Sequence, residues 1–135
     1  MAVVVETLEY HTDARGMVFE PLKDPVLGNQ KNVHVVTTQP GGVRGNHRHL
    51  RATEVLVTQG PARVRYRDQE EIREVMVGAD KLMRFTFPAG VSHAVENTGT
   101  QPQVLVSFST QPYNPQSPDV VTDVLLPVAR QQRAV

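Results

Sequence analysis

The chain has 135 residues, a length that supports one domain with one hydrophobic core. Its 14 basic and 14 acidic residues cancel, which argues against broad electrostatic binding to nucleic acid or to an anionic membrane. The chain has no cysteine, so a disulfide framework, a thiolate metal site and a cysteine nucleophile are all excluded.

Short apolar blocks and alternating patterns run along the chain, and no segment has the spacing of an amphipathic helix. Gly and Pro separate these blocks. In chain order, strands are predicted at 3–8, 17–22, 33–38, 54–58, 62–66, 72–77, 82–87, 104–108 and 120–126. About ten short strands at close spacing predict an all-β barrel or sandwich. We expect the domain to cover residues 1–127 and a disordered tail to follow over 128–135.

The N-terminal segment lacks the basic and long apolar regions of a signal peptide. No run approaches the roughly 20 apolar residues that a membrane helix needs. Together with the absence of cysteine, these features favour a cytoplasmic protein without a membrane partner.

Two segments in the second third of the chain concentrate the candidate metal ligands. His47 and His49 are two residues apart, so in an extended strand both side chains point to the same face. Glu54 and His93 would complete a set of three imidazoles and one carboxylate from neighbouring strands. Such a set suits one divalent transition metal, with zinc preferred and iron, nickel or manganese as alternatives.

These segments resemble the two sequence motifs of the cupin superfamily. In the first motif, the gap between the glutamate and the last glycine is one residue shorter than usual, and its positions are Gly41, His47, His49, Glu54 and Gly60. The second motif matches throughout, at Pro88, Gly90, His93 and Asn97. The resemblance implies a single-domain cupin jelly-roll β-barrel that holds a metal inside its mouth. His11 and His34 belong to neither motif, and we interpret them as solvated polar residues.

A narrower resemblance, from about residue 13 to 126, links the chain to sugar-nucleotide epimerases. Asp13-x-Arg15-Gly16 and Arg44-Gly-Asn-His47 resemble segments of the dTDP-4-dehydrorhamnose 3,5-epimerase class, where the histidine is the catalytic base. The chain is also similar to the C-terminal cupin domain of bifunctional capsular-polysaccharide enzymes that act on UDP-linked 4-keto sugars. The segments that carry this second likeness are 44–49, 80–82, 93–97 and 113–115.

The resemblance implies an epimerase or isomerase that acts beside the ketone of a nucleotide-linked 4-keto-6-deoxy sugar. His47 would be the base, or else a metal ligand, and Tyr113 would be the acid. Cationic side chains would bind the sugar nucleotide. The candidates are Arg15, Arg44, Arg63, Arg65 and Lys81.

Two other functions remain open for the same residues. One is a metal-dependent cupin dioxygenase, because three histidines and a glutamate also suit iron. The other is a non-catalytic cupin that binds a sugar or a sugar nucleotide. We further expect a homodimer, because the short apolar strand at 3–8 is the kind of edge that proteins pair or cover.

Overall fold

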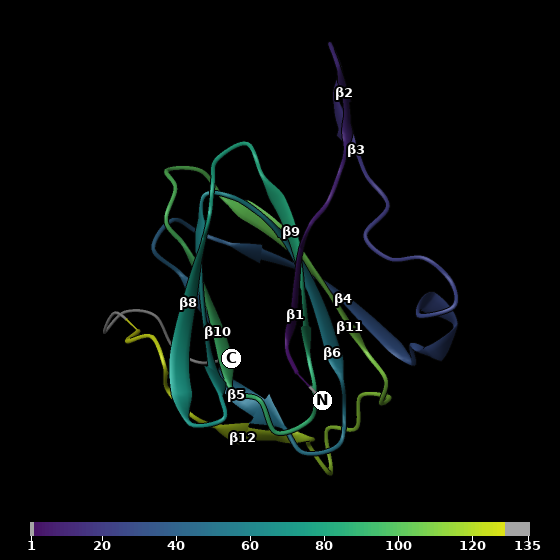
Figure 1. Cartoon of the computed structure of the whole chain (residues 1–135), viewed down its shortest axis with the longest axis vertical. Helices are drawn as coiled ribbons and strands as arrows, with labels where there is room; N and C mark the ends of the chain where they lie inside the picture. Colours follow the sequence, from purple (N-terminus) through teal and green to yellow (C-terminus); the bar gives the residue numbers. More distant parts are fainter. Residues whose placement is uncertain (1, 129–135) are drawn as a thin grey trace.

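The computed structural model describes residues 2–128, so the expected tail lies outside the described residues except for its first residue. Figure 1 shows a structure made almost entirely of strands. The one helical element between residues 2 and 128 is the short 3-10 helix η1 (Leu27–Asn29). No helix in this part of the chain is long and apolar enough to cross a membrane. The expected all-β fold is confirmed.

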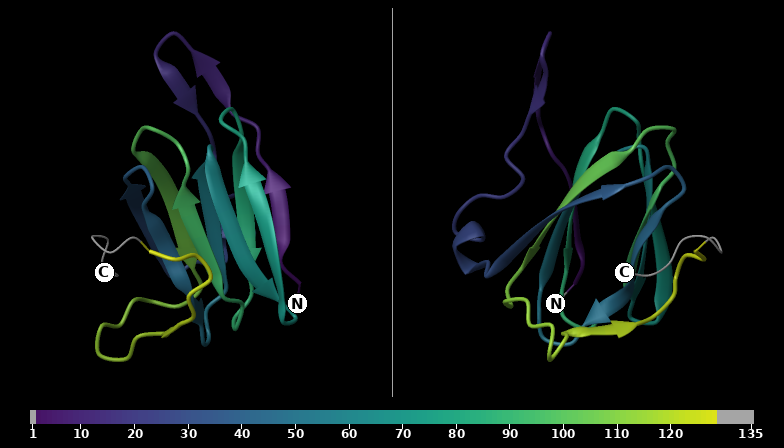
Figure 2. Two further views of the ribbon diagram at one scale, coloured as in Figure 1. Left: turned by 90° about the vertical axis from the view of Figure 1, so that its left-hand side faces the viewer. Right: turned by 180° about the vertical axis from the view of Figure 1, so that it is seen from behind.

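Two five-stranded sheets face each other (Figure 2). Sheet I has the order β1 (Val4–Thr7), β9 (Leu82–Phe87), β6 (Glu54–Gln59), β11 (Gln103–Ser109) and β4 (Asn32–Thr38). Sheet II has the order β12 (Val120–Thr122), β5 (Val43–His49), β10 (His93–Asn97), β7 (Ala62–Asp68) and β8 (Glu71–Val77). All the pairings are antiparallel, and most neighbours are distant in sequence, as in a jelly roll. The two sheets form a flattened, sandwich-like jelly roll, which agrees with the cupin fold that the sequence resemblance implied.

All nine predicted strands are present, although two of them are shorter than expected. Strand β3 (Gly16–Val18) ends before Pro21, which can donate no hydrogen bond to a sheet. Strand β12 ends at Thr122, after which the chain leaves the sheet and packs against its outer face. Three strands were not among those predicted: β2 (His11–Asp13), β5 and β10. Strand β2 pairs with β3 in a hairpin that projects from the body of the molecule (Figure 1).

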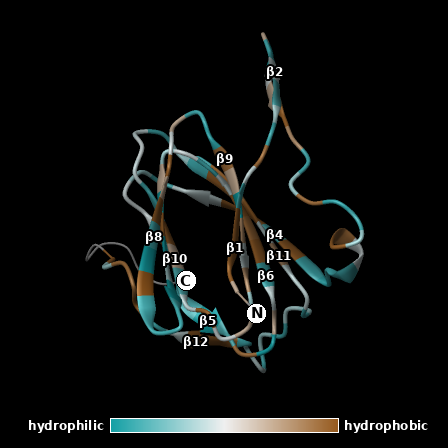
Figure 3. Ribbon diagram, in the orientation of Figure 1, coloured by the Kyte–Doolittle hydropathy of each residue, from teal (hydrophilic) through white to brown (hydrophobic). Residues whose placement is uncertain are grey.

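The hydrophobic core fills the space between the sheets. Its centre is formed by Leu56, Val64, Phe85, Phe87 and Leu105. Strand β5 differs from this pattern, because it is largely hydrophilic although it lies inside sheet II (Figure 3). Buried polar residues in the interior of a sheet are uncommon, and they mark this end of the sandwich as the place to look for function.

Candidate metal centre and adjoining cavity

A β-bulge in strand β5 decides which of its side chains enter the interior. Ala94 of β10 pairs with Gly45 and His93 pairs with His47, so Asn46 is an extra residue without a partner on β10. In a regular strand Arg44 and His47, three residues apart, would point to opposite faces. The extra residue reverses the alternation, and both side chains line the cavity between the sheets.

The bulge requires the residue types that occupy it. Gly45 has φ 86°, and a Cβ atom there would lie 2.7 Å from the carbonyl oxygen of His93. Only glycine fits this close approach of two strands. Asn46 has φ 58°, in the left-handed region that asparagine tolerates better than most other residues.

The side chain of Asn46 also anchors the segment that follows β12. Its Nδ2 donates to the carbonyl oxygen of Leu126 at 2.9 Å, and its Oδ1 accepts from the backbone N–H groups of Leu125 and Leu126 at 2.9 and 3.0 Å. Leu125 and Leu126 are buried against Ala94 on the outer face of sheet II. One buried amide therefore joins the bulge to the C-terminal segment.

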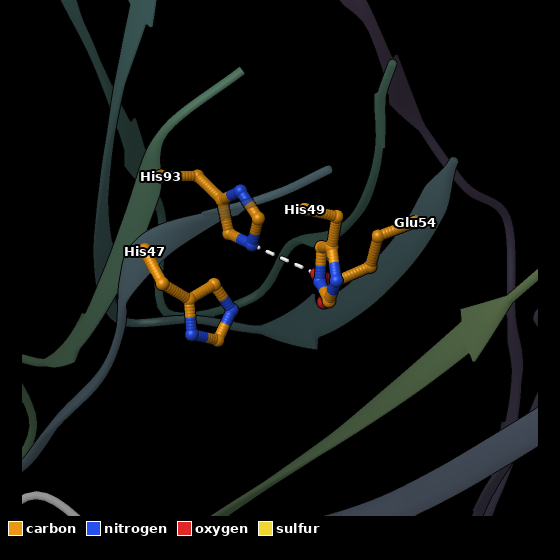
Figure 4. Close-up of side chains that lie close together, drawn as sticks. All are labelled: His47, His49, Glu54 and His93. Carbon is orange, nitrogen blue, oxygen red and sulfur yellow. Dashed lines mark hydrogen bonds and ion pairs between the residues drawn. The ribbon is translucent and has the colours of Figure 1, made fainter. Parts of the chain in front are cut away.

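Four potential ligands converge at the interior end of β5 (Figure 4). His47 and His49 come from β5, His93 from β10 and Glu54 from the facing sheet at the start of β6. One ligand atom from each of the four residues lies within 4.8 Å of the others. Glu54 thus joins the cluster despite the shortened gap in the first motif.

Hydrogen bonds orient the groups of this cluster. The Nε2 atom of His49 lies 2.7 Å from Oε1 of Glu54, and the hydroxyl of Ser107 donates to Oε2 at 2.7 Å. The Nδ1–H of His93 donates to the carbonyl oxygen of Val91 at 3.1 Å. This hydrogen bond fixes the tautomer of neutral His93 and leaves Nε2 with a lone pair aimed into the cluster.

His93 supplies the observation that bears most directly on a metal. Its Nε2 lies 2.8 Å from Oε1 of Glu54, yet the orientation does not meet hydrogen-bond geometry, and Nε2 has no hydrogen-bond partner among residues 2–128. The residue is only 1% exposed, so it has no access to bulk solvent. Two basic atoms that converge in this way fit a cation between them, and the chemistry of the four donors fits a transition metal.

The charges of the cluster favour a neutral His47 and an ionised Glu54. Burial, reinforced by the neighbouring His93, lowers the pKa of His47 to about 4, so His47 is neutral near pH 7. Burial opposes ionisation of Glu54, but the charge of His93 and the contacts with His49 and His93 outweigh it and hold the pKa of Glu54 well below its usual range. Burial likewise opposes protonation of His93, but the Glu54 carboxylate raises the pKa of His93.

A cavity of about 390 Å³ opens above the four-residue cluster. Sheet I contributes one wall, with Asn32, His34 and Ser107, and the segment between β11 and β12 forms the rim, with Tyr113 and Asp119 among its residues. Such a volume lies near the lower end of the range for small-molecule sites, roughly 300–1,000 Å³. It suits a single sugar-sized group better than a complete nucleotide sugar.

The structure brings some of the sequence-predicted site residues together and separates others. The four proposed ligands, Arg44 and Tyr113 all line the cavity. Arg63 and Arg65 lie on the outward-facing side of β7, where they pair with Glu96 and Glu74. Arg15 lies on the projecting hairpin and pairs with Asp13. Lys81 precedes β9 and does not line the cavity, so the expected cationic site is reduced to Arg44.

The sequence interpretation missed several residues of the site. Asn46 was read only as part of a motif, and nothing in the local pattern indicates a bulge. His34 lies between two valines and Ser107 lies between Val106 and Phe108, and only the pairing of β11 with β4 places them side by side. Asp119 was missed because it lies in an irregular segment; its carboxylate accepts hydrogen bonds from the backbone of Arg51 and Ala52, and so holds the rim beside β5.

Comparisons with known proteins agree with this fold and identify a family. Residues 11–121 match the family described as the polysaccharide biosynthesis C-terminal domain. The UDP-2-acetamido-2,6-beta-L-arabino-hexul-4-ose reductase of Pseudomonas aeruginosa is 30% identical over 112 residues, which are 81% of this chain and 29% of the reductase. The spore coat polysaccharide biosynthesis protein SpsL of Bacillus subtilis is 28% identical over 127 residues, which are 87% of this chain and 84% of SpsL.

Solved structures also match the fold of this chain. The capsular polysaccharide assembling protein CapF of Staphylococcus aureus matches with 29% identity and a TM-score of 0.64, over 87% of this chain and 33% of CapF. This chain therefore spans about a third or less of the length of CapF and of the reductase. ChmJ, a 3'-monoepimerase from Streptomyces bikiniensis in complex with dTDP-quinovose, matches with a TM-score of 0.73 at 17% identity, over 90% of this chain and 69% of ChmJ. That likeness shows a shared jelly-roll fold.

The anchoring role of Asn46 predicts a large loss of stability when its amide is removed. Asn46→Ala would leave three backbone groups of residues 125 and 126 without their partner. We expect the free energy of unfolding to fall by about 2–4 kcal/mol, measured by chemical denaturation. Asn46→Gly, which keeps the left-handed backbone, should also be destabilised, whereas Asn29→Ala on exposed η1 should change stability by less than about 0.5 kcal/mol. A change below about 1 kcal/mol for both Asn46 variants would contradict the anchoring role.

Proposed function

Because the chain belongs to the polysaccharide biosynthesis C-terminal domain family, we propose that it is a metal-binding epimerase or isomerase of a nucleotide-linked 4-keto-6-deoxy sugar. The observation that carries this proposal is a sugar-sized cavity that ends on three imidazoles and a carboxylate. The names of two relatives add support, since one is a reductase of a UDP-linked hexulose and the other a polysaccharide biosynthesis protein.

His47, His49, Glu54 and His93 would hold one divalent metal, with zinc the preferred ion and iron, nickel or manganese the alternatives. The geometry supports this assignment because His93 Nε2 is buried, converges on Oε1 of Glu54 at 2.8 Å, and has no hydrogen-bond partner among residues 2–128. When bound, the ion would act as a Lewis acid toward a carbonyl oxygen.

The remaining residues of the cavity would bind the sugar and move its protons. A C–H bond beside a ketone is acidic because the electron pair left on carbon delocalises onto the carbonyl oxygen. Tyr113 lies at the rim and would act as the acid. Arg44 lines the cavity, and its NH2 group donates to the carbonyl oxygen of Thr37 at 2.6 Å, which fixes the direction of the side chain. Arg44 would bind the keto oxygen or a phosphate.

Removal of ligands should remove the metal. We expect purified protein to hold close to one equivalent of divalent metal by elemental analysis, and the double variant His49→Ala, His93→Ala to lose most of it. His11→Gln is the matched control, because His11 lies on the projecting hairpin away from the cluster and its loss should leave metal content unchanged. Stoichiometric metal in the double variant would disprove the ligand assignment.

Solvent exchange tests the reaction. In deuterated water, the protein with its metal should introduce deuterium into the carbon beside the ketone of a UDP- or dTDP-linked 4-keto-6-deoxy sugar, followed by mass spectrometry. His47→Ala should abolish this exchange, because it removes a proposed metal ligand at the floor of the cavity. If no keto-sugar nucleotide exchanges its hydrogen, the epimerase proposal fails. Oxygen consumption that depends on iron(II) would instead support a dioxygenase.

We also propose that the protein forms a homodimer through the outer face of sheet I. Strands β1 and β4 are the two edges of this sheet. Val4 on β1, Val33 and Val35 on β4, and Val104 on neighbouring β11 all expose their apolar side chains, and Val35 is 71% exposed. Val33, Val35 and Val104 lie on the adjacent strands β4 and β11, whereas Val4 lies on the opposite edge. Exposed valines on neighbouring edge strands are typical of a surface that is covered by a partner.

The dimer is tested by light scattering at micromolar concentration. The wild-type protein should have twice the mass of one chain, and Val35→Glu should shift the mass toward that of the monomer, because it places a charge in the apolar contact. Ile72→Glu is the matched control, since Ile72 is exposed on β8 in the other sheet and should leave the dimer intact. A monomeric wild-type protein would contradict the proposal.

A further inference from the structure

The wall of the cavity opposite β5 carries a histidine that lies outside the proposed metal set. His34 is on β4, where it pairs in register with Ser107 of β11, and both residues line the cavity. The hydroxyl of Ser107 donates to Glu54, so the wall is continuous from the four-residue cluster to His34. His34 comes from sheet I, whereas His47, His49 and His93 come from sheet II.

A metal and a proton compete for the same imidazole lone pair. A histidine that binds an ion through one nitrogen is a poor acceptor for a substrate proton at that nitrogen. The chain has five histidines, all of them among the described residues, and three belong to the four-residue cluster. His11 lies on the projecting hairpin, outside this cavity. His34 is therefore the one imidazole that lines the cavity and is not committed to the cluster.

Tyr113 lies next to His34 at the opening of the cavity. The two rings are 6.3 Å apart between centroids and nearly perpendicular, at 80°. Tyr113 is 69% exposed and belongs to the rim, whereas His34 belongs to the sheet wall. The two groups bring a proton acceptor and a proton donor to the same cavity that the proposed metal ligands line.

We infer that His34 is the base that removes the proton beside the ketone, while His47, His49, Glu54 and His93 serve the metal. This inference rests on the proposed function. In the first step the C–H proton passes to a ring nitrogen of His34, and the electron pair of that bond becomes the carbon–carbon double bond of an enolate, with its charge on the ketone oxygen. In the second step the carbon takes a proton from the hydroxyl of Tyr113 and the ketone re-forms. A proton then returns from the His34 imidazolium to the Tyr113 phenolate, which resets both groups.

This division of roles separates two demands that one residue could not meet. In the cluster, Glu54 and His93 are buried and His47 and His49 are half-buried, with hydrogen bonds that hold His49, Glu54 and His93 in place, as a metal site requires. His34 faces the open side of the cavity, where a substrate carbon can approach and where a proton can be exchanged with solvent. Local sequence gave no sign of this role, because a single polar residue in a run of valines resembles an ordinary solvated position.

The test compares His34→Gln with the wild-type protein and with His11→Gln, all loaded with the same metal. Glutamine keeps a polar side chain of similar size but cannot accept a proton at neutral pH. His34→Gln should keep the wild-type metal content and unfolding midpoint, while deuterium exchange into UDP- and dTDP-linked 4-keto-6-deoxy sugars should fall 10²–10⁴-fold, the usual contribution of a general base. Added imidazole should restore part of the exchange in His34→Gln and none in a protein stripped of metal. His11→Gln should behave as the wild type.

Three results would overturn the inference, and they are distinguishable. Exchange by His34→Gln within about threefold of the wild type would exclude His34 as the base and leave the proposed function standing. Loss of metal from His34→Gln would show that the residue acts through the cluster. Absence of exchange in the wild-type protein with its metal would overturn the proposed function together with this inference. His34→Asn serves as a second variant if the first does not fold.

Discussion

The bulge at Gly45 and Asn46 is the constraint on which the rest of the site depends. Without the extra residue, the alternation of β5 would turn His47 away from the interior, and the histidine pair would face the wrong side of sheet II. Glycine permits the close approach to β10, and the asparagine amide ties the bulge to the chain after β12. The unusual backbone of two residues thus decides which side chains the cavity receives.

The interior then holds a carboxylate and three imidazoles at the end of an otherwise apolar core. Burying ionisable groups without compensation costs several kcal/mol, so a fold keeps such a cluster only where the groups are paired or bind an ion. Glu54 belongs to sheet I and the imidazoles to sheet II, so their interaction also joins the two layers. His93 is stacked on Phe87 with ring centroids 4.3 Å apart, which ties the cluster to the hydrophobic core.

Much of the fold could be predicted from sequence, since alternating apolar residues mark the strands, as at 62–66 and 82–87. The convergence of the four proposed ligands could also be predicted, because His47 and His49 keep their spacing within one strand. The functions of single charged residues could not be predicted from sequence. Arg63 and Arg65 alternate with buried residues, but sequence alone cannot say which side of β7 faces the cavity. The position of His34 in the cavity wall depends on the pairing of β4 with β11, which are far apart in the chain.

The central claim is that the bulge assembles a metal site at the floor of the cavity. Anomalous X-ray diffraction at the zinc absorption edge, on crystals of the protein supplied with one equivalent of zinc, tests it most directly. The account predicts one strong peak about 2.0–2.1 Å from a ring nitrogen of His47, of His49 and of His93. A peak elsewhere on the molecule, or none at this cluster in a fully loaded crystal, would contradict it.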